Sequence, residues 1–143
     1  LKQKLDYFEA PVSGILVKLK GLDEPVPLGS LGDGTVRLFQ MALALIRSEK
    51  ATFIIDEIDT GLHYSMHHKL WKLIVETAKR LDIQVFATTH SLDCIRGLAH
   101  FVEENPESSD EVMLHRIEPE LKRTMNYSGD EIAMSIQHEL ELR

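Results

Sequence analysis

The sequence predicts an α/β fold built on a parallel β-sheet. Its 143 residues alternate between short apolar runs and longer segments in which apolar residues recur with helical spacing. The run Phe53–Ile55 is apolar at consecutive positions, a pattern typical of a strand covered on both faces. Ile83–Thr88 is a second run of this kind. Strands that alternate with helices are joined by right-handed crossovers and lie parallel in one sheet.

Composition limits the classes of protein to which the chain can belong. A hydrophobic content of 43% is enough for a core, and the net charge of −7 argues against a main surface that binds nucleic acid. Cys94 is the one cysteine, which gives no disulfide framework and fits a reducing cytoplasm. No apolar run approaches the length of a membrane span, and the chain begins at Leu1. We therefore expect a piece of a longer cytoplasmic protein with no membrane partner.

The first half of the chain is predicted to form two strands and one helix. Ile15–Leu19 is expected to be the leading strand, and a polar stretch rich in glycine and proline follows over residues 21–34. Thr35–Arg47 then has helical periodicity. The predicted core face of this helix consists of Val36, Phe39, Leu43 and Ile46. The strand that begins at Phe53 completes this half.

The second half is predicted to continue the alternation of helices and strands. The expected elements are a helix capped by Ser65 and ending near Leu81, the strand Ile83–Thr88, a helix capped by Ser91 and ending near Val102, a loop over residues 105–110, and a strand Val112–Ile117 that ends before Pro119. The last strand is expected to join the parallel sheet. Ser128 and Glu131 have the spacing of a capping box, so a terminal amphipathic helix is expected after them.

A glycine-rich segment, Leu31–Thr35, stands at the entrance to the first predicted helix. Gly32 and Gly34 would let the backbone approach a ligand, and the amides and dipole of a helix N-terminus favour an anion. The segment therefore predicts a contact with phosphate. The alternative is an ordinary glycine turn that caps the helix, because such turns are common connectors.

Two adjacent carboxylates, Asp56 and Glu57, follow the first apolar run directly. Open α/β sheets bind their ligands at the carboxyl ends of the strands. There Asp56 could hold Mg²⁺ through its water shell, and Glu57 could orient or deprotonate an attacking water. This arrangement is typical of the Walker B motif of nucleotide hydrolases. The alternative is a solvated strand end, although charges beside a buried strand are costly unless something uses them.

His90 follows the second apolar run, in the segment Val85–Ser91. If the two strands are neighbours, its imidazole lies beside the carboxylates and could contact a γ-phosphate or the attacking water. A single histidine at a strand end can also be purely structural. The functional interpretation is favoured because the glycine segment, the acid pair and the histidine occur together in this order.

Together these motifs resemble those of an ABC-type ATPase head, of the kind found in SMC-like, RecF-like and OLD-like ATPases. The chain resembles the C-terminal half of such a head, as in the bacterial AAA-domain group related to OLD proteins, several of which serve in phage defence. The resemblance implies a three-layer, P-loop NTPase-like parallel sheet. Residues 1–34 would then supply the leading strand and signature loop. Residues 35–143 would supply the core with the Walker B, D-loop and switch-histidine motifs.

The resemblance also implies roles for individual residues. Leu31–Thr35 is similar to the ABC signature, Asp59–His63 to the D-loop, and His90 to the switch histidine. By the same resemblance Asp56 positions Mg²⁺ and Glu57 is the catalytic glutamate. The ATP contacts implied are Ser30, Gly32, Asp33, Gly34, Thr35, Asp59, Thr60 and Gly61.

The sequence departs from the ABC pattern in three ways. Gly32 replaces the signature serine that touches γ-phosphate across the dimer, which leaves backbone amides, Ser30 or Thr35 for that contact. His63 stands where many relatives have an acid. The phosphate loop, Gly-x-x-x-x-Gly-Lys-[Ser/Thr], is absent, and the sequence contains no Gly-Lys pair. Since that loop lies N-terminal to these motifs in ABC-type heads, we expect a fragment that lacks the Walker A lobe and cannot hydrolyse ATP alone.

Two functions from different classes are compatible with these residues. The first is Mg²⁺-dependent ATP hydrolysis in a homodimer of heads with ATP between them, which drives or switches a DNA-repair-like or phage-defence-type complex. A separate effector or nuclease protein, and DNA contact through missing regions, would accompany this function. The second is a nucleotide-regulated scaffold that does not hydrolyse ATP. Glu57 favours the first function, and Gly32 keeps the second open.

A zinc site is an alternative interpretation of three histidines in the middle of the chain. His63 and His67 are four residues apart, and His68 is adjacent, which is a spacing found in some zinc sites. No glutamate lies where a metalloprotease needs it, and two histidines on one helix face do not complete a coordination shell. A zinc centre is therefore disfavoured.

Overall fold

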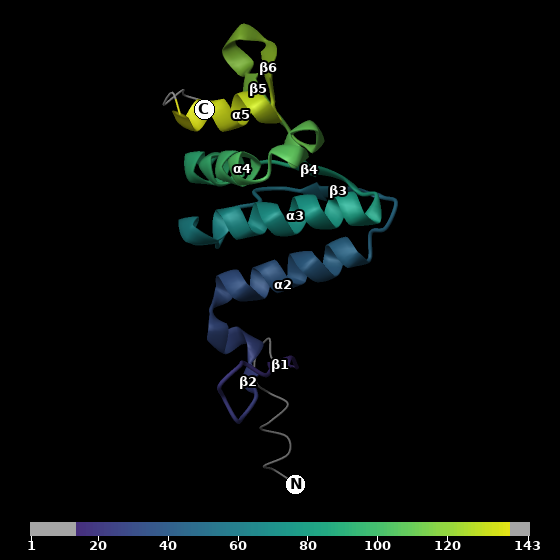
Figure 1. Ribbon diagram of the computed structural model, residues 1–143, viewed down its shortest axis with the longest axis vertical. Coiled ribbons are helices and arrows are strands. Elements are labelled where there is room, and N and C mark those ends of the chain that lie inside the picture. Colours follow the sequence, from purple (N-terminus) through teal and green to yellow (C-terminus); the bar gives the residue numbers. More distant parts are fainter. Residues whose placement is uncertain (1–13, 138–143) are drawn as a thin grey trace.

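The computed structural model describes residues 14–137. Residues 1–13 of the predicted segment 1–34, and residues 138–143 of the predicted segment 35–143, lie outside the described part. Helices α2, α3, α4 and α5 lie one above another in chain order, with a small hairpin at each end of the stack (Figure 1). Strands β3 and β4 lie behind α3 in this view. The expected α/β class is confirmed by this arrangement.

The parallel sheet consists of two strands in the described part of the chain. Strand β3 (Thr52–Ile55) pairs in parallel with β4 (Gln84–Ala87), and Ile55 lies opposite Ala87. The predicted neighbourhood of the two apolar runs is therefore confirmed. The carboxyl ends of both strands meet at one edge, which brings the residues after Ile55 and Ala87 together.

Three helices cover one face of this sheet. They are α2 (Asp33–Ile46), α3 (His67–Leu81) and α4 (Leu92–Glu104). Their shared core includes Leu45, Leu70 and Cys94, packed around Ile55 and Ile58 from the β3 segment. Burial of this apolar surface supplies most of the stability of the unit and fixes β3 against the helices.

The other face of the sheet is open among the described residues, which corrects the prediction of a strand buried on both sides. Ile54 is 76% exposed, and its cross-strand partner Phe86 is 51% exposed. The helices that follow β3 and β4 pack on the same face, where Phe53 and Val85 contact the core. Consecutive apolar residues in a strand therefore did not guarantee cover on both faces.

The core face of α2 also differs from the prediction. Leu43 and Ile46, expected to be inward, are 46% and 56% exposed. The buried face instead contains Met41 and Leu45, with Leu38 packed against the same core. Because α2 is apolar on more than one side, helical spacing alone did not identify the side that contacts α3.

A short hairpin precedes α2. Strands β1 (Leu16–Val17) and β2 (Val26–Pro27) pair in antiparallel fashion. The 3₁₀ helix η1 (Leu28–Leu31) then leads into α2. The leading strand is thus shorter than the predicted Ile15–Leu19, and the polar stretch over residues 21–34 contains a strand and a helical turn.

The start of α3 is likewise different from the prediction. Ser65 was expected to cap this helix, but it lies inside the 3₁₀ helix η2 (Tyr64–Met66), and α3 begins only at His67. The side chain of His63 caps η2 by accepting the Ser65 amide. By contrast, the predicted cap of α4 is confirmed, since Ser91 Oγ accepts the Cys94 amide at 3.2 Å.

The C-terminal strands form a separate antiparallel sheet, which corrects the prediction that they extend the parallel one. After the 3₁₀ helix η3 (Pro106–Glu111), strand β5 (Met113–Glu118) pairs with β6 (Arg123–Ser128), which was not predicted. The short 3₁₀ helix η4 (Pro119–Leu121) reverses the chain between them. A strand whose partner follows directly by a tight turn needs no crossover into the parallel sheet.

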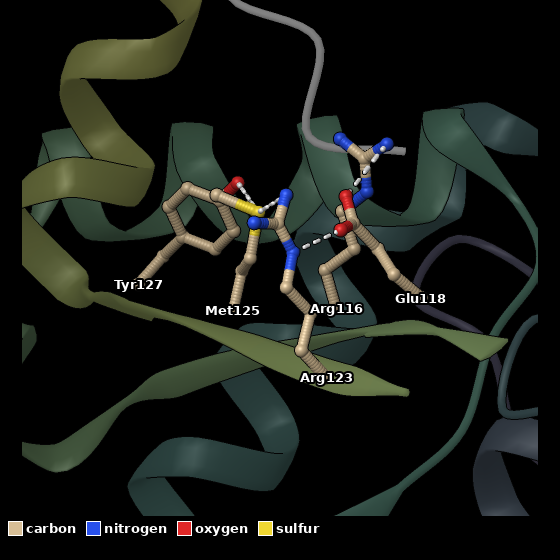
Figure 2. A network of polar contacts seen from close by, with 5 residues as sticks. All are labelled: Arg116, Glu118, Arg123, Met125 and Tyr127. Carbon is tan, nitrogen blue, oxygen red and sulfur yellow. Dashed lines mark hydrogen bonds and ion pairs between the residues drawn. The ribbon is translucent and has the colours of Figure 1, made fainter. Parts of the chain in front are cut away.

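The two strands of this hairpin carry a row of polar contacts along one face (Figure 2). Glu118 accepts a hydrogen bond from Arg123 Nε at 2.6 Å and lies 3.5 Å from Arg116 Nη2. Met125 Sδ lies 3.9 Å from both Arg123 Nη2 and the Tyr127 hydroxyl. Of these contacts, the one between Glu118 and Arg123 crosses from β5 to β6, and it joins two residues that lie opposite each other in the register.

Helix α5 (Gly129–Gln137) closes the described chain. The predicted capping box is confirmed, because the Ser128 amide donates to Glu131 Oε2 at 2.8 Å and the Glu131 amide donates to Ser128 Oγ at 3.4 Å. The Glu131 carboxylate accepts hydrogen bonds from the Ser128 amide and the Ser128 hydroxyl, and these two bonds lower its pKa. Ile132 packs with Phe101 and Val102 of α4 in a second core. Within residues 14–137, no helix has the length and apolarity that crossing a membrane requires.

Candidate nucleotide site

Asp56 and Glu57 lie at the carboxyl edge of the parallel pair, as the sequence predicted for ligand-binding residues. Thr88, which follows β4, bridges them. Its hydroxyl donates to Asp56 Oδ1 at 2.5 Å and accepts the Glu57 amide at 2.9 Å. The Thr88 carbonyl also accepts the Ile58 amide at 2.9 Å. The turn after β3 is therefore tied directly to the residue two positions before His90.

Glu57 has an unusual backbone conformation. Its φ is 47°, in the left-handed region that residues other than glycine and asparagine seldom adopt. Its carbonyl accepts hydrogen bonds from the Thr60 amide at 3.0 Å and from Arg37 Nη2 at 2.9 Å. Its carboxylate accepts the Thr60 hydroxyl at 3.1 Å. Strain of this kind persists only where surrounding contacts fix it, and it is frequent at functional sites.

The D-loop segment follows as a tight turn beside the same edge. The Leu62 amide donates to the Asp59 carbonyl at 3.0 Å, and Gly61 has a φ of 74°. The Thr89 hydroxyl donates to the Asp59 carboxylate. Asp59, Thr60 and Gly61 are thus next to Glu57, and Asp59 is bonded to the segment that carries His90.

The signature segment lies against this turn. A Cβ atom at Gly34 would be 3.4 Å from Leu62 Cδ2 and 3.5 Å from the Gly61 carbonyl oxygen. Gly32 is the N-cap of α2, with φ 91° and ψ 155°. As the first amides of a helix, those of Asp33 and Gly34 have no acceptor within it and are available to an anion. The Asp33 carboxylate in the same turn favours the helix but opposes a phosphate.

The conformation of Gly32 explains why serine is absent from this position. Residues with a side chain are strained at this combination of φ and ψ, which is adopted almost entirely by glycine. Of the two hydroxyls considered as replacements, Ser30 Oγ donates to the Pro27 carbonyl at 2.7 Å and Thr35 Oγ1 donates to the Leu31 carbonyl at 3.1 Å. Both keep oxygen lone pairs, but their protons are used locally. The backbone amides are the better candidates for a phosphate.

His90 lies at the start of the α4 segment and is exposed to solvent. Its neighbours are fixed, because the Thr89 hydroxyl accepts the Ser91 amide at 3.0 Å and Ser91 caps α4. Behind this segment Cys94 is fully buried. Burial raises the pKa of its thiol to about 11, so it is a core residue and not a nucleophile at neutral pH.

The residues present fit magnesium held through water and phosphate better than a protein-ligated metal. The described residues contain no group of three or more metal-ligating side chains. Mg²⁺ usually keeps several waters and takes one or two carboxylates plus substrate phosphates. Asp56 meets this requirement, since its carboxylate is exposed at the strand end and oriented by Thr88. When bound, Mg²⁺ would neutralise charge on the phosphates.

The histidines considered for zinc have other surroundings. His63 Nδ1 lies 2.9 Å from Ser65 Oγ, and His68 Nε2 lies 2.9 Å from Glu104. His67 is 4% exposed, and neither of its ring nitrogens has a hydrogen-bond partner among the described residues. His63 and His68 thus contact different groups, and the three histidines form no metal-ligating cluster among the described residues.

Three residues at this edge did not figure among the predicted site residues: Arg37, Thr88 and Thr89. Thr88 and Thr89 come directly after β4, so their hydroxyls lie close to the residues that follow the neighbouring strand β3. Arg37 is the cation in the second turn of α2, next to the apolar residues Leu38 and Phe39. Both features were visible in the sequence, but their partners are about 20 to 31 positions away along the chain.

The sequence of the chain is similar to that of a bacterial protein of known name. A Helicobacter pylori protein named ATP/GTP phosphatase is 34% identical over 91 residues, which are 62% of this chain and 25% of that protein. The chain therefore spans about a quarter of that relative.

A solved structure from work on the structural biochemistry of ATP-driven dimerization and DNA stimulated activation of SMC ATPases also matches. Its TM-score is 0.50 at 18% identity, over 94% of this chain and 78% of that one, which supports a P-loop NTPase-like fold. Residues 11–95, more than half of the chain, match the family described as "AAA domain, putative AbiEii toxin, Type IV TA system". The chain belongs to this family of AAA domains.

Proposed function

We propose that this chain is the C-terminal part of an ATP-binding domain that hydrolyses ATP with Mg²⁺ where two heads meet. The observation that carries the proposal is the single edge at which Asp56, Glu57 and the His90 segment come together, joined through Thr88. Asp56 would hold Mg²⁺ through water, and Glu57 would orient the attacking water. His90 would contact the γ-phosphate.

The signature segment supports the assignment of a shared site. The amides of Asp33 and Gly34 open α2 and have no acceptor within the helix, and Gly34 packs beside the D-loop. In the proposed homodimer these amides, with Ser30, Asp33, Thr35 and the turn Asp59–Gly61, would line the nucleotide of the opposite head. The phosphate loop would come from residues outside the chain, so the chain alone should not hydrolyse ATP.

The proposed setting is a cytoplasmic complex of the DNA-repair or phage-defence type. A separate effector or nuclease, and DNA contact through other regions of the protein, would give the ATPase its target. The relative named ATP/GTP phosphatase supports hydrolysis as the reaction. The structure matched among SMC ATPases supports the head fold on which such dimers are built.

The test is Glu57→Gln in the full-length protein that contains this chain. We expect kcat to fall by ~10²- to 10⁴-fold while ATP affinity is retained, because a general base acts mainly in the transition state. Steady-state turnover and equilibrium nucleotide binding should be measured on the same samples. Glu49→Gln is the matched control, since Glu49 is an exposed acid that precedes β3.

Each outcome has a clear meaning. Turnover lost with binding retained supports hydrolysis by Glu57. No turnover in the wild type, with ATP still bound, would replace the proposal by the nucleotide-regulated scaffold. Equal loss of binding and turnover in Glu57→Gln would show that Glu57 is a structural residue.

A further inference from the structure

The backbone of Glu57 is held from three directions. Thr88 accepts its amide, Thr60 donates to its carbonyl, and Arg37 donates to the same carbonyl at 2.9 Å. The first two contacts belong to the strand edge and the turn. Arg37 alone comes from α2, the helix that the signature segment opens. A cationic donor makes a stronger hydrogen bond to a carbonyl than a neutral donor does.

The guanidinium of Arg37 is held beside the Glu57 carbonyl. Its Nε is buried and has no hydrogen-bond partner among the described residues. Arg37 lines an open hollow of about 340 Å³ that also includes Gln40, Phe53 and Asp56. Removing one nitrogen of a charged guanidinium from water costs free energy unless the other nitrogens make compensating contacts. The contact with the Glu57 carbonyl is the compensating one that the structure shows.

We infer that Arg37 is a positioning residue that holds Glu57 in its left-handed conformation and so aims the Glu57 carboxylate. The inference rests on the proposed function, in which Glu57 orients the attacking water. Without the cation, the carbonyl keeps only the Thr60 amide, and the strained φ of 47° loses one of its supports. Arg37 itself need not contact the nucleotide.

The test is Arg37→Met in the full-length protein, compared with Arg37→Lys. We expect kcat to fall about 10- to 100-fold in Arg37→Met, with KM for ATP nearly unchanged, because misplacing a reacting group slows the chemical step. Arg37→Lys keeps a cationic donor and should recover part of the loss. Arg47→Met is the control, because Arg47 lies at the exposed C-terminal end of the same helix.

The double variant Arg37→Met, Glu57→Gln separates positioning from general stability. If Arg37 acts through Glu57, its loss should cause no further fall in kcat once Glu57 is replaced. A full additional fall, or a kcat of Arg37→Met equal to that of the wild type, would overturn the inference. Rates are compared per folded molecule, and if Arg37→Met does not fold, Arg37→Gln takes its place in the same cycle. A wild type without turnover would instead reject the proposed function.

Discussion

Asp56 and Glu57 are adjacent, but the structure holds them by different atoms. Asp56 is oriented through its carboxylate by Thr88, which suits a group that must present oxygen to a hydrated cation. Glu57 is fixed mainly through its backbone, by Arg37, Thr60 and Thr88. Its carboxylate, bonded to the Thr60 hydroxyl, can turn without disturbing the strand. These different contacts agree with the proposed roles, in which Asp56 holds Mg²⁺ and Glu57 orients the attacking water.

At the same scale, Gly32→Ser tests whether the missing signature serine could simply be restored. We expect it to lower the free energy of unfolding by about 1–3 kcal/mol, because a side chain at φ 91° and ψ 155° is strained. The measurement is urea unfolding of the full-length protein. Gly29→Ser is the control, since a Cβ at Gly29 meets nothing within 4 Å. Equal stability of both variants would show that the Gly32 conformation is not required.

Which of these residues could be predicted depends on how local their contacts are. The acids and His90 were predictable because each directly follows an apolar run, and parallel strands place their ends together. The left-handed φ of Glu57 was not predictable, since nothing in its own residue type favours it. Arg37 acts across 20 positions, so its partner becomes apparent only when α2 is packed beside β3.

At the scale of elements, the sequence predicted the order of helices and strands better than their packing. Helices α2, α3 and α4 were expected, but the choice of core face in α2 depended on where α3 lies. Strand β6 was missed although Met125 and Tyr127 alternate with polar residues, which is a strand signal. The other residues of β6 are polar, so the strand signal from Met125 and Tyr127 is weak. Burial and register are properties of pairs of elements, so a single segment does not determine them.

The contact between α3 and α4 gives a prediction at this scale. A Cβ atom at Gly97 of α4 would lie 2.6 Å from His67 Cβ and 3.1 Å from the His67 carbonyl carbon, at the start of α3. Gly97→Ala should therefore separate the two helix starts, one of which follows the D-loop and the other His90. We expect a loss of about 1–3 kcal/mol in stability and a lower ATPase rate per folded molecule.

Gly129→Ala is a matched control for this effect. A Cβ there would lie 2.3 Å from the Ser109 carbonyl oxygen, between η3 and α5 and away from the acid pair. It should also lower Tm, but the rate per folded molecule should stay close to that of the wild type. If both variants alter the rate equally, the contact of α3 with α4 has no special influence on the site.

At the scale of the whole molecule, large apolar side chains are exposed at several places, among them the parallel sheet, α2 and the C-terminal hairpin. On the sheet these are Ile54 and Phe86, and on α2 they are Leu43 and Ile46. The matched structure supports a P-loop NTPase-like fold. The three-layer sheet and the missing Walker A lobe stay predictions.

Dimerisation is the prediction that tests the whole arrangement. In the full-length protein, ATP should produce a dimer, most visibly with Glu57→Gln, because slow turnover preserves the bound nucleotide. Gly34→Glu should abolish that dimer while each subunit still binds ATP, since a carboxylate at the α2 N-terminus would repel the phosphate. Mass by light scattering, with and without ATP, is the measurement.

Two variants separate the charge effect from a packing defect. Gly34→Ala places only a Cβ at 3.4 Å from Leu62, an ordinary contact, so the ATP-dependent dimer should remain. Thr124→Glu adds the same charge on the exposed β6 strand, far along the chain from the signature segment, and should also dimerise. A Gly34→Glu protein that still dimerises with ATP and hydrolyses it normally would remove the signature assignment. Since the trans contact depends on those amides, the shared ATP site would then have to be built from other residues.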